Sequence, residues 1–234
     1  DRRVRLALSK AINRNAIVER VMEGVAIPAG QLLADGFFGV SPNVKPPAYD
    51  PEGAKKLLAE AGYPNGFKMT IHGPNGRYTN DVKILEAVAQ MFTRIGVETT
   101  IEALPPAVYF NRASTGANGL PEFSFILVGW GSDTGETSSP LKTLLGTFNK
   151  ETGFGAANRG RYSNPELDKL IAQALATVDD AKRQDVLAKA VELAMEDVGL
   201  IPTHYQINTW ASKKGLKYEA RADEYTLAMS LKKN

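Results

Sequence analysis

The stretch FKMTIHGPNGRYTNDVKILEAVAQMFTRIGVETTI (residues 67–101) decides the fold of this 234-residue chain. Apolar and polar residues alternate over 67–72 and again over 97–101, which is typical of half-exposed β-strands. Between them, Asn80 is expected to cap a helix whose apolar residues recur at helical spacing, and Gly96 to end it. A strand, a helix and a second strand in this order predict a βαβ unit with parallel strands and a right-handed crossover.

The residues before this unit predict three more helices and a long loop. Helical spacing over 4–12 and again over 17–22 indicates two short helices. The many Gly and Pro residues of 25–49 predict an irregular connection. Asp50-Pro51-Glu52 (residues 50–52) starts a further helix, because Asp is a good N-cap, Pro suits the first helical position and Glu suits the first turn. Gly62 is expected to end that helix.

The residues after the unit continue the alternation of helices and strands. The nearly continuous apolar run 123–128 predicts a strand that is buried on both faces. Further elements are expected as helices at 107–114, 140–145, 165–175 and from Asp179 or Asp180 to 194, and as strands at 200–205 and 225–231. Without an internal repeat or a flexible linker, this order predicts one α/β domain with a mixed, partly parallel sheet and flanking helices.

Composition excludes several classes of function. The chain carries 28 Lys and Arg against 26 Asp and Glu, so no long-range field favours nucleic acid. It contains no cysteine, which excludes disulfides and thiolate nucleophiles. Its apolar runs are too short to span a bilayer, and no signal peptide is visible. Asp1 leads directly into a helical pattern, and we expect the chain to be a fragment of a longer polypeptide.

Six stretches, taken in order, carry a recognisable pattern: VRLALSKAINRNAIV (4–18), YDPEGAKKLLAEAGYPNG (49–66), NGRYTNDVKILEAVAQMFTRIGV (75–97), FILVGWGSD (125–133), GRYSNPELDKLIAQA (160–174) and DEYTLAM (223–229). They resemble the carboxy-terminal lobe of the family 5 extracellular solute-binding proteins, which includes the dipeptide-, oligopeptide- and nickel-binding proteins of ABC importers. Each motif alone is weak, and the resemblance rests on their order.

The resemblance implies one lobe of a type II, periplasmic-binding-protein-like fold with two lobes and about twice this length. Residues 1–222 would be the carboxy-terminal ligand-binding lobe, and 223–234 a strand segment that belongs with the absent amino-terminal lobe. The implied function is a monomeric substrate-binding component that delivers a peptide, an opine or a nickel complex to ABC permease subunits. The implied location is periplasmic, or extracellular and membrane-anchored in a Gram-positive host. No cofactor is expected.

The predicted strand 123–128 ends in Gly129-Trp130-Gly131-Ser132-Asp133, where ligands bind in open α/β sheets. In a dry cleft a carboxylate can hold an ammonium group strongly, and the resemblance implies that Asp133 grips a peptide's amino terminus. Trp130 offers a flat apolar wall, and Gly129 and Gly131 allow close approach of a ligand. Ser132 is expected to line the same site. The structural alternatives are a loop-capping Asp, a core Trp and glycines that only permit the turn.

Four further residues are candidate ligand contacts. Arg77 and Tyr78 follow the strand 67–72, on its carboxyl side. Arg159 and Arg161 precede the helix 165–175, and an Arg side chain can bind a carboxylate with two parallel hydrogen bonds. The alternative for the arginines is an ordinary surface charge.

Metal binding and catalysis have weaker support in the sequence. His72 and His204 are the two histidines and show no metal-ligand spacing, so no protein-built metal site is expected. Asp133 and Glu136 could form a carboxylate pair for glycoside hydrolysis, which is the alternative function. No nucleophile elbow or P-loop motif occurs, and we do not expect an enzyme. A chaperone-like interaction domain is a third reading, which a large exposed apolar face would favour.

Overall fold

A computed structural model describes residues 1–221 and 223–233. The predicted βαβ unit is confirmed as β2 (Phe67–Pro74), α4 (Asp81–Thr93) and β3 (Val97–Leu104). The two strands are parallel and pair from Phe67 opposite Val97 to Pro74 opposite Leu104. Gly66 and Gly96 lie side by side at the start of both strands and have positive φ angles of 71° and 91°, which glycine adopts without strain.

A third chain segment lies parallel to β2 on its other edge. His72 donates its backbone N–H to the Phe125 carbonyl (2.9 Å) and accepts from the Leu127 N–H (2.8 Å). Ile126 thereby forms an isolated parallel bridge with His72. The predicted strand 123–128 is therefore present only around this bridge.

The prediction that residues 123–128 are buried on both faces is wrong, because residues 125–128 are only half-buried. One side of the segment packs on the main core, whereas Ile126 packs on a small cluster of Phe123 and Tyr109 under α5 (Pro106–Ser114). The Tyr109 hydroxyl donates to the Leu127 carbonyl at 2.7 Å. A single short helix thus holds the segment without covering it fully.

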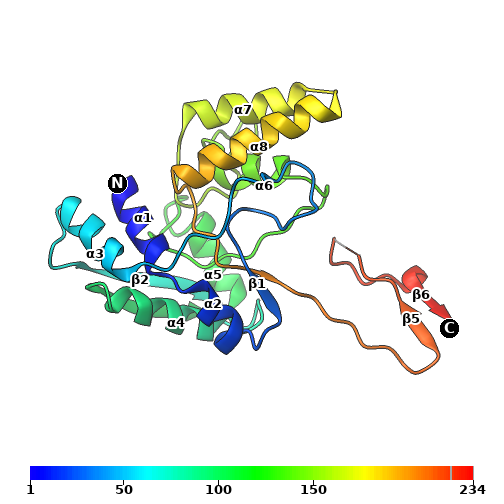
Figure 1. The fold of residues 1–234 in the computed structure, drawn as a ribbon, viewed down its shortest axis with the longest axis horizontal. Helices are drawn as coiled ribbons and strands as arrows, with labels where there is room; N and C mark the ends of the chain where they lie inside the picture. The colour runs from blue at the N-terminus through cyan, green and yellow to red at the C-terminus, as the bar shows by residue number, and fades with distance from the viewer. Residues whose placement is uncertain (222, 234) are drawn as a thin grey trace.

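The main core lies between this sheet and the helices of the first hundred residues (Figure 1). These helices are α1 (Arg2–Ala11), α2 (Arg14–Ala16), the π-helical turn η1 (Ile17–Val21), α3 (Pro51–Glu60) and α4. The predicted start of α3 is confirmed, since the Asp50 carboxylate accepts from the Gly53 N–H at 2.8 Å. Apart from the short strand β1 (Ala26–Pro28), the predicted irregular connection 25–49 is also confirmed.

A second core forms between α7 (Pro165–Ala176), α8 (Asp180–Glu196) and the turn made by α6 (Ser138–Pro140) and η2 (Leu141–Leu145). Asn164 and Asp179 cap α7 and α8, and Asp179 is one of the two residues at which the second of these helices was expected to start. Figure 1 shows α7 and α8 packed against each other above α6.

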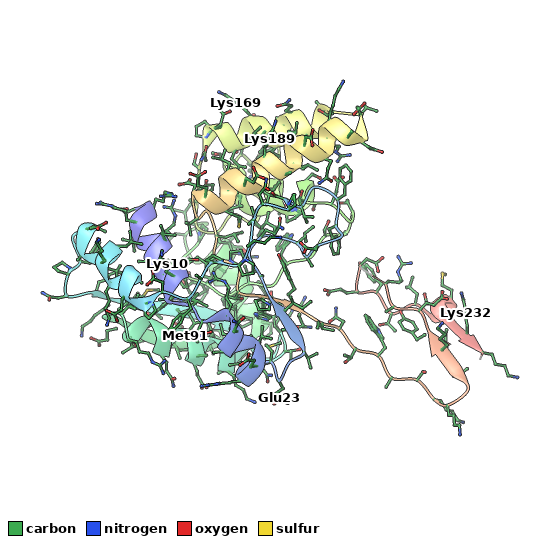
Figure 2. All side chains as sticks on the ribbon, viewed as in Figure 1. Lys10, Glu23, Met91, Lys169, Lys189 and Lys232 are labelled. Atoms are coloured by element: carbon green, nitrogen blue, oxygen red, sulfur yellow. The ribbon has the colours of Figure 1, made fainter. Side chains whose placement is uncertain are left out.

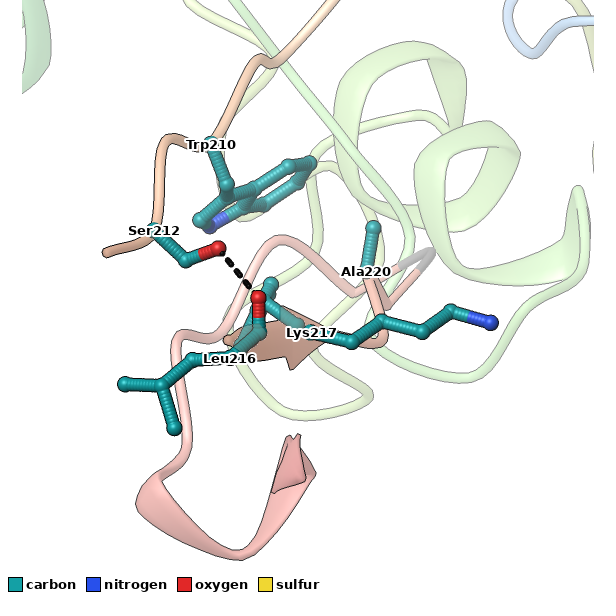
Figure 3. Close-up of a pocket in the computed structure, with 6 residues that line it drawn as sticks. Trp210, Ser212, Leu216, Lys217 and Ala220 are labelled. Atoms are coloured by element: carbon teal, nitrogen blue, oxygen red, sulfur yellow. Dashed lines mark hydrogen bonds between the residues drawn. The ribbon is translucent and has the colours of Figure 1, made fainter. Parts of the chain in front are cut away.

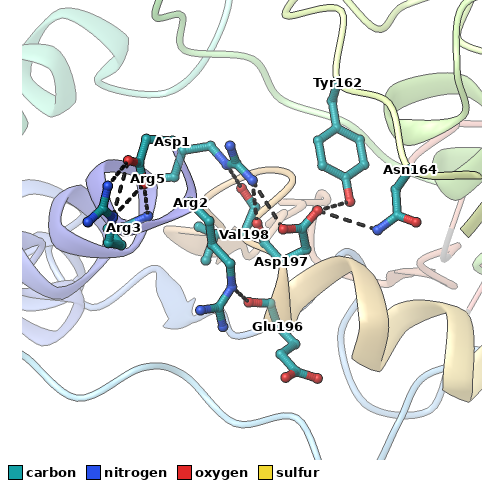
Figure 4. Close-up of polar contacts among 9 residues, drawn as sticks. All are labelled: Asp1, Arg2, Arg3, Arg5, Tyr162, Asn164, Glu196, Asp197 and Val198. Atoms are coloured by element: carbon teal, nitrogen blue, oxygen red, sulfur yellow. Dashed lines mark hydrogen bonds and ion pairs between the residues drawn. The ribbon is translucent and has the colours of Figure 1, made fainter. Parts of the chain in front are cut away.

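The two cores are joined where α1 meets the end of α8 (Figure 4). Arg2 donates to the Glu196 carbonyl (2.9 Å), and Arg5 donates to the carbonyls of Val198 (2.9 Å) and Asp197 (2.7 Å). The Tyr162 hydroxyl donates to the Asp197 carboxylate at 2.6 Å. Cationic side chains satisfy the free carbonyls at a helix C-terminus and interact favourably with its dipole.

The last strands do not follow the prediction. β4 (His204–Gln206) pairs antiparallel with β1, so the strand predicted at 200–205 is shorter and begins later. The strand predicted at 225–231 is wrong: η3 (Ala228–Ser230) is a 3₁₀ turn, and β6 (Leu231–Lys233) pairs antiparallel with β5 (Leu216–Tyr218). The strands thus form a parallel pair and two separate antiparallel pairs, which agrees with an α/β fold and a partly parallel sheet.

Residues after β4 form an arm that extends away from both cores (Figure 1). Most side chains of the arm, Lys232 among them, stand apart from the rest of the molecule (Figure 2). Tyr225 is 61% exposed and Met229 82%. The expected boundary at 222/223 lies within this arm, and Ala222 and Asn234 lie outside the described residues.

Candidate functional site

Asp133 lies in the loop that follows the strand segment at Ile126, on the carboxyl side of the parallel strands. Its side chain is exposed, and no described residue donates a hydrogen bond to its carboxylate or forms an ion pair with it. The carboxylate borders an open hollow of about 350 Å³, whose lining residues are Phe37, Ser132, Asp133, Thr134, Gly135, Arg221 and Asp223. An unpaired acceptor at the edge of a hollow can receive a cationic group.

The loop around Asp133 is held by its own hydrogen bonds. The buried Ser132 hydroxyl donates to the Glu136 carbonyl (2.7 Å) and accepts from the Glu136 N–H (3.1 Å). Ser132 therefore shapes the loop, and its hydroxyl proton is already used. The loop needs this support because its glycines supply no side-chain packing of their own.

Phe37 was not a predicted site residue, yet it forms one wall of the hollow. Backbone pairing places it there: the Phe38 N–H donates to the Gly135 carbonyl (3.2 Å), and the Thr137 N–H donates to the Phe38 carbonyl (2.9 Å). Phe37 comes from the long irregular connection 25–49, where no periodic pattern shows which side chains face inward. A bridge between two loops has no local sequence signal.

Tyr78 contacts the same loop at Gly129. Its ring is so close to Gly129 that a Cβ atom added there would approach a ring carbon to 2.7 Å, and its hydroxyl donates to the Gly129 carbonyl at 3.4 Å. The Arg77 guanidinium stacks over the Tyr78 ring, 5.0 Å from its centre. The structure thus brings together the predicted residues Arg77, Tyr78 and Gly129. A side chain at position 129 would collide with the Tyr78 ring, so glycine there does more than permit the turn.

The loop that carries Arg77 and Tyr78 is organised by Asp81. This carboxylate accepts from the N–H groups of Arg77 (2.9 Å), Tyr78 (3.1 Å) and Val82 (2.9 Å). Burial tends to raise the pKa of Asp81, but these backbone donors outweigh it and hold the pKa below its ordinary value. The predicted Asn80 cap is wrong: Asn80 makes no side-chain cap bond and instead donates its amide to the Val21 carbonyl at 2.8 Å.

Trp130 and Gly131 face outward. Trp130 is 42% exposed, so it is not an ordinary core tryptophan at a strand end. A Cβ atom added at Gly131 would meet nothing within 4 Å. Both residues leave room for another molecule, as a ligand-facing loop requires.

Arg159 and Arg161 do not line the hollow of Asp133. The Arg159 Nε donates to the Ser114 hydroxyl at 3.2 Å, and its guanidinium lies 5.4 Å from the centre of the Phe110 ring. Arg161 stacks 3.9 Å from the centre of the Phe148 ring and donates to the Asn158 carbonyl. Arg159 therefore contacts α5, whereas Arg161 contacts residues of the chain between η2 and α7.

In the alternative carboxylate pair of Asp133 and Glu136, the Glu136 carboxylate already has partners. Glu136 forms an ion pair with Arg183 and accepts a short hydrogen bond from Ser138, so its carboxylate is committed within the loop. Within residues 1–221 and 223–233, no three His, Cys, Asp or Glu side chains gather closely enough to hold a metal ion. His72 is only partly satisfied: its Nε2 pairs with Glu102 at 3.0 Å and its ring stacks on Phe123, but its buried Nδ1 has no hydrogen-bond partner among the described residues.

Comparison with known proteins assigns this fold to the type II periplasmic-binding-protein class. A family model described as bacterial extracellular solute-binding proteins, family 5, middle region, matches residues 1–152. Because that match covers more than half of the chain, the chain belongs to this family, as the six sequence motifs indicated.

Similarity to individual proteins supports this family assignment. The chain is 30% identical over 211 residues to heme-binding protein A of Haemophilus influenzae and 32% identical over 203 residues to glutathione-binding protein GsiB of Escherichia coli K12. These matches cover 88% and 86% of the chain but only 36% and 38% of the relatives. The chain therefore spans well under half the length of these relatives.

Solved structures give the same picture. The periplasmic binding protein DppA of Helicobacter pylori in complex with the peptide STSA superposes with a TM-score of 0.79 at 28% identity, over 88% of this chain and 38% of that one. A dipeptide-binding protein from Pseudoalteromonas sp. SM9913 in complex with Met-Leu superposes with a TM-score of 0.81 at 26% identity, over 100% of this chain and 45% of that one. The arm is included in the second superposition.

The family is one of solute-binding proteins that act outside the cytoplasmic membrane, as its description states. Over the part of the chain that the structure describes, no helix has both the length and the apolar character needed to cross a bilayer.

Proposed function

We propose that this chain is one lobe of the substrate-binding component of an ABC importer, which captures a peptide or peptide-like solute between two lobes. The observation that carries the proposal is the exposed Asp133 carboxylate, without a described partner, at the carboxyl edge of parallel strands in a chain of this family. Ligands bind at this edge of open α/β sheets. Capture follows from lobe closure, because a solute that contacts both lobes only in the closed form shifts the population toward closure.

Asp133 holds the ammonium group of the solute in this proposal. The neighbouring surfaces are suited to the rest of a peptide: Trp130 and Tyr78 offer flat rings, and Gly129 and Gly131 let a main chain approach. Arg77, stacked on Tyr78, supplies a positive charge at the rim. Ser132 contributes through the shape of the loop. Arg159 and Arg161 belong to the proposed site only at its margin, since both have contacts of their own.

Residues 223–234 are proposed to belong with the amino-terminal lobe. The arm exposes apolar side chains that would be more stable when covered, including Tyr225, Met229 and Leu231. The outer part of the arm carries an open hollow lined by Trp210 and Leu216, among other residues (Figure 3). An uncovered aromatic surface on an extended arm fits a segment that packs against a second lobe.

The closed protein would then dock on permease subunits, which import the solute. We propose that it acts as a monomer without catalytic activity, in the periplasm or anchored outside the membrane of a Gram-positive host. The proposed solute is a peptide, an opine or a nickel complex, and two of the similar structures are complexes with the peptides STSA and Met-Leu.

The test uses the full-length protein, trialanine and N-acetyltrialanine, with binding measured by calorimetry. Trialanine should bind, and acetylation, which removes the ammonium charge, should weaken binding at least tenfold, since hydrogen bonds to charged groups contribute about 1.5–3 kcal/mol. Asp133→Asn should cause a similar loss for trialanine. Asp185→Asn, an exposed carboxylate on α8, is the control and should change nothing.

Equal binding of both peptides, or unchanged affinity in Asp133→Asn, would remove Asp133 from the proposed site. The 234-residue chain alone should bind trialanine at least a hundredfold more weakly than the full-length protein, because half of a cleft supplies about half of the contacts and does not exclude water. Submicromolar binding by this chain alone would contradict the two-lobed account.

A further inference from the structure

The hollow beside Asp133 is built from three separate parts of the chain. The loop 132–135 forms one side, Phe37 forms a second, and Arg221 and Asp223 from the arm form the third. The arm residues were not predicted site residues. They add the only cation and a second carboxylate to the described lining, so the nature of the hollow depends on how these two charges are arranged.

Arg221 and Asp223 are paired with each other. The Arg221 Nε lies 2.9 Å and 3.1 Å from the two carboxylate oxygens of Asp223, and Nη2 contacts the same carboxylate. The Tyr225 N–H also donates to Asp223 at 3.2 Å. A guanidinium has five N–H donors, and the pair with Asp223 occupies the edge formed by Nε and Nη2. No described residue accepts a hydrogen bond from Nη1.

The lining therefore carries one guanidinium and two carboxylates, a net charge of −1. Arg221 and Asp223 offset each other, which leaves the Asp133 charge uncompensated. A solute with a single positive charge neutralises this hollow. A solute with a carboxylate directly beside its ammonium group adds a negative charge that the guanidinium, already paired, binds less well.

We propose that Asp223 is a specificity-determining residue that acts by engaging Arg221. With Arg221 engaged, the hollow selects an ammonium group that is followed by a neutral carbonyl, as at the amino terminus of a peptide. It binds an ammonium group that is followed by a carboxylate less well. Arg221 then donates from Nη1 to the solute's carbonyl oxygen. Phe37 contributes an aromatic face, which favours a nearby cation. This inference rests on the proposed function, since it places the solute's ammonium group on Asp133.

The experiment measures binding of alaninamide, alanine and N-acetylalaninamide to the full-length protein by NMR titration at millimolar concentration. The wild type should prefer alaninamide over alanine by at least tenfold, and N-acetylalaninamide should not bind. Asp223→Asn frees the guanidinium and should reduce the preference to less than threefold. Arg221→Gln leaves two carboxylates and should increase it.

These opposite shifts separate a role in specificity from a merely structural one, which would weaken alaninamide and alanine equally. Glu219→Gln removes a carboxylate on the same arm that pairs with Lys232 outside the hollow, and it should leave the preference unchanged. Equal binding of alanine and alaninamide to the wild type, no measurable binding of alaninamide, or equal preference in all variants would overturn the inference. Tight binding of N-acetylalaninamide would instead contradict the ammonium role of Asp133.

Discussion

Asp81 is the residue whose replacement tests most directly how the site loop is held. Its side chain is 4% exposed and accepts three backbone hydrogen bonds, two of them from the residues that present the Arg77 and Tyr78 side chains. We consider Asp81→Asn, which keeps the shape of the side chain and removes its charge. The amide nitrogen of Asn then faces backbone N–H groups that need an acceptor.

The expected cost follows from these three bonds. A hydrogen bond to a charged group contributes about 1.5 kcal/mol at the low end of its range, which gives roughly 4–5 kcal/mol for three. The Asn carbonyl oxygen keeps part of this as a neutral acceptor, so the free energy of unfolding should fall by about 2 kcal/mol at pH 7. In urea, with a slope of about 2 kcal/mol per molar, the midpoint should move down by about 1 M.

The pH dependence gives the sharper check. Because the pKa of Asp81 is held below its ordinary value of 3.8 by the backbone donors, its contribution to stability is present above that value and is lost as the pH falls through the lower, folded pKa. The difference between wild type and Asp81→Asn should be constant from pH 7 to about pH 5 and shrink below pH 4. Urea unfolding followed by far-UV circular dichroism at several pH values measures it.

Asp185→Asn serves as the control, because that carboxylate is exposed on α8 and should contribute within ±0.5 kcal/mol. A cost for Asp81→Asn that stays the same down to pH 3, or that is below 0.5 kcal/mol at pH 7, would refute the reasoning. The first result would mean that the cost does not come from the lost carboxylate charge.

Three further substitutions test other parts of the structure. Gly66→Ala should prevent stable folding or cost more than about 3 kcal/mol in thermal unfolding, because its Cβ would lie 1.7 Å from the Gly96 carbonyl oxygen. The control Gly62→Ala meets no atom within 4 Å and should cost only about 1 kcal/mol for its positive φ. Equal costs for the two substitutions would contradict the close approach of Gly66 to Gly96. Tyr162→Phe should lower the free energy of unfolding by about 1–2 kcal/mol, because the hydrogen bond to Asp197 is lost. Burial and that bond raise the pKa of Tyr162 to about 12. A spectrophotometric titration in which every tyrosine ionises near pH 10 would contradict the bond between Tyr162 and Asp197. Gly129→Ala should push the Tyr78 ring aside and weaken trialanine binding by the full-length protein about tenfold. Unchanged affinity would contradict the need for glycine beside that ring.

Much of the fold could be predicted from sequence because its signals are local. The Asp50-Pro51-Glu52 start of α3 and the caps at Asn164 and Asp179 depend on residues within one turn of each other. The alternation in β2 and β3 is likewise visible in each strand alone. Asn80 shows the limit: it has a good capping side chain, but a contact with the Val21 carbonyl, far away in sequence, takes that side chain instead.

Strand length could not be predicted in the same way, because a strand needs a partner. Residues 123–128 and 225–231 both have a strand-like apolar pattern, but only Ile126 in the first finds a paired neighbour on β2. In the second, residues 228–230 form a 3₁₀ turn, and pairing begins at Leu231. The pattern shows which residues favour a strand, and the chain elsewhere decides which of them form one.

The candidate site likewise contains some residues whose positions could be predicted from local sequence and others whose positions could not. The position of Asp133 beyond the carboxyl end of the parallel strands could be predicted from the strand pattern that precedes it, and so could the positions of Arg77 and Tyr78 after the neighbouring strand. Phe37 and Arg221 reach the hollow from a loop and an arm that are distant in sequence. Nothing in their immediate neighbours marks them, because loop-to-loop pairing and the path of the arm are properties of the folded chain.

The distribution of hydrogen bonds explains why a single carboxylate dominates this site. Ser132 is bonded to the backbone of Glu136, and Glu136 is paired with Arg183, so the Ser132 hydroxyl and the Glu136 carboxylate are already occupied. In open water an ammonium at 4 Å from Asp133 would gain only about 1 kcal/mol, but about 4 kcal/mol at the lower effective dielectric of a protein surface. The same carboxylate therefore attracts a cation weakly in an open groove and strongly once water is displaced. Under the proposed function, closure by a second lobe would displace that water and so set both the affinity and the ability to discriminate by charge.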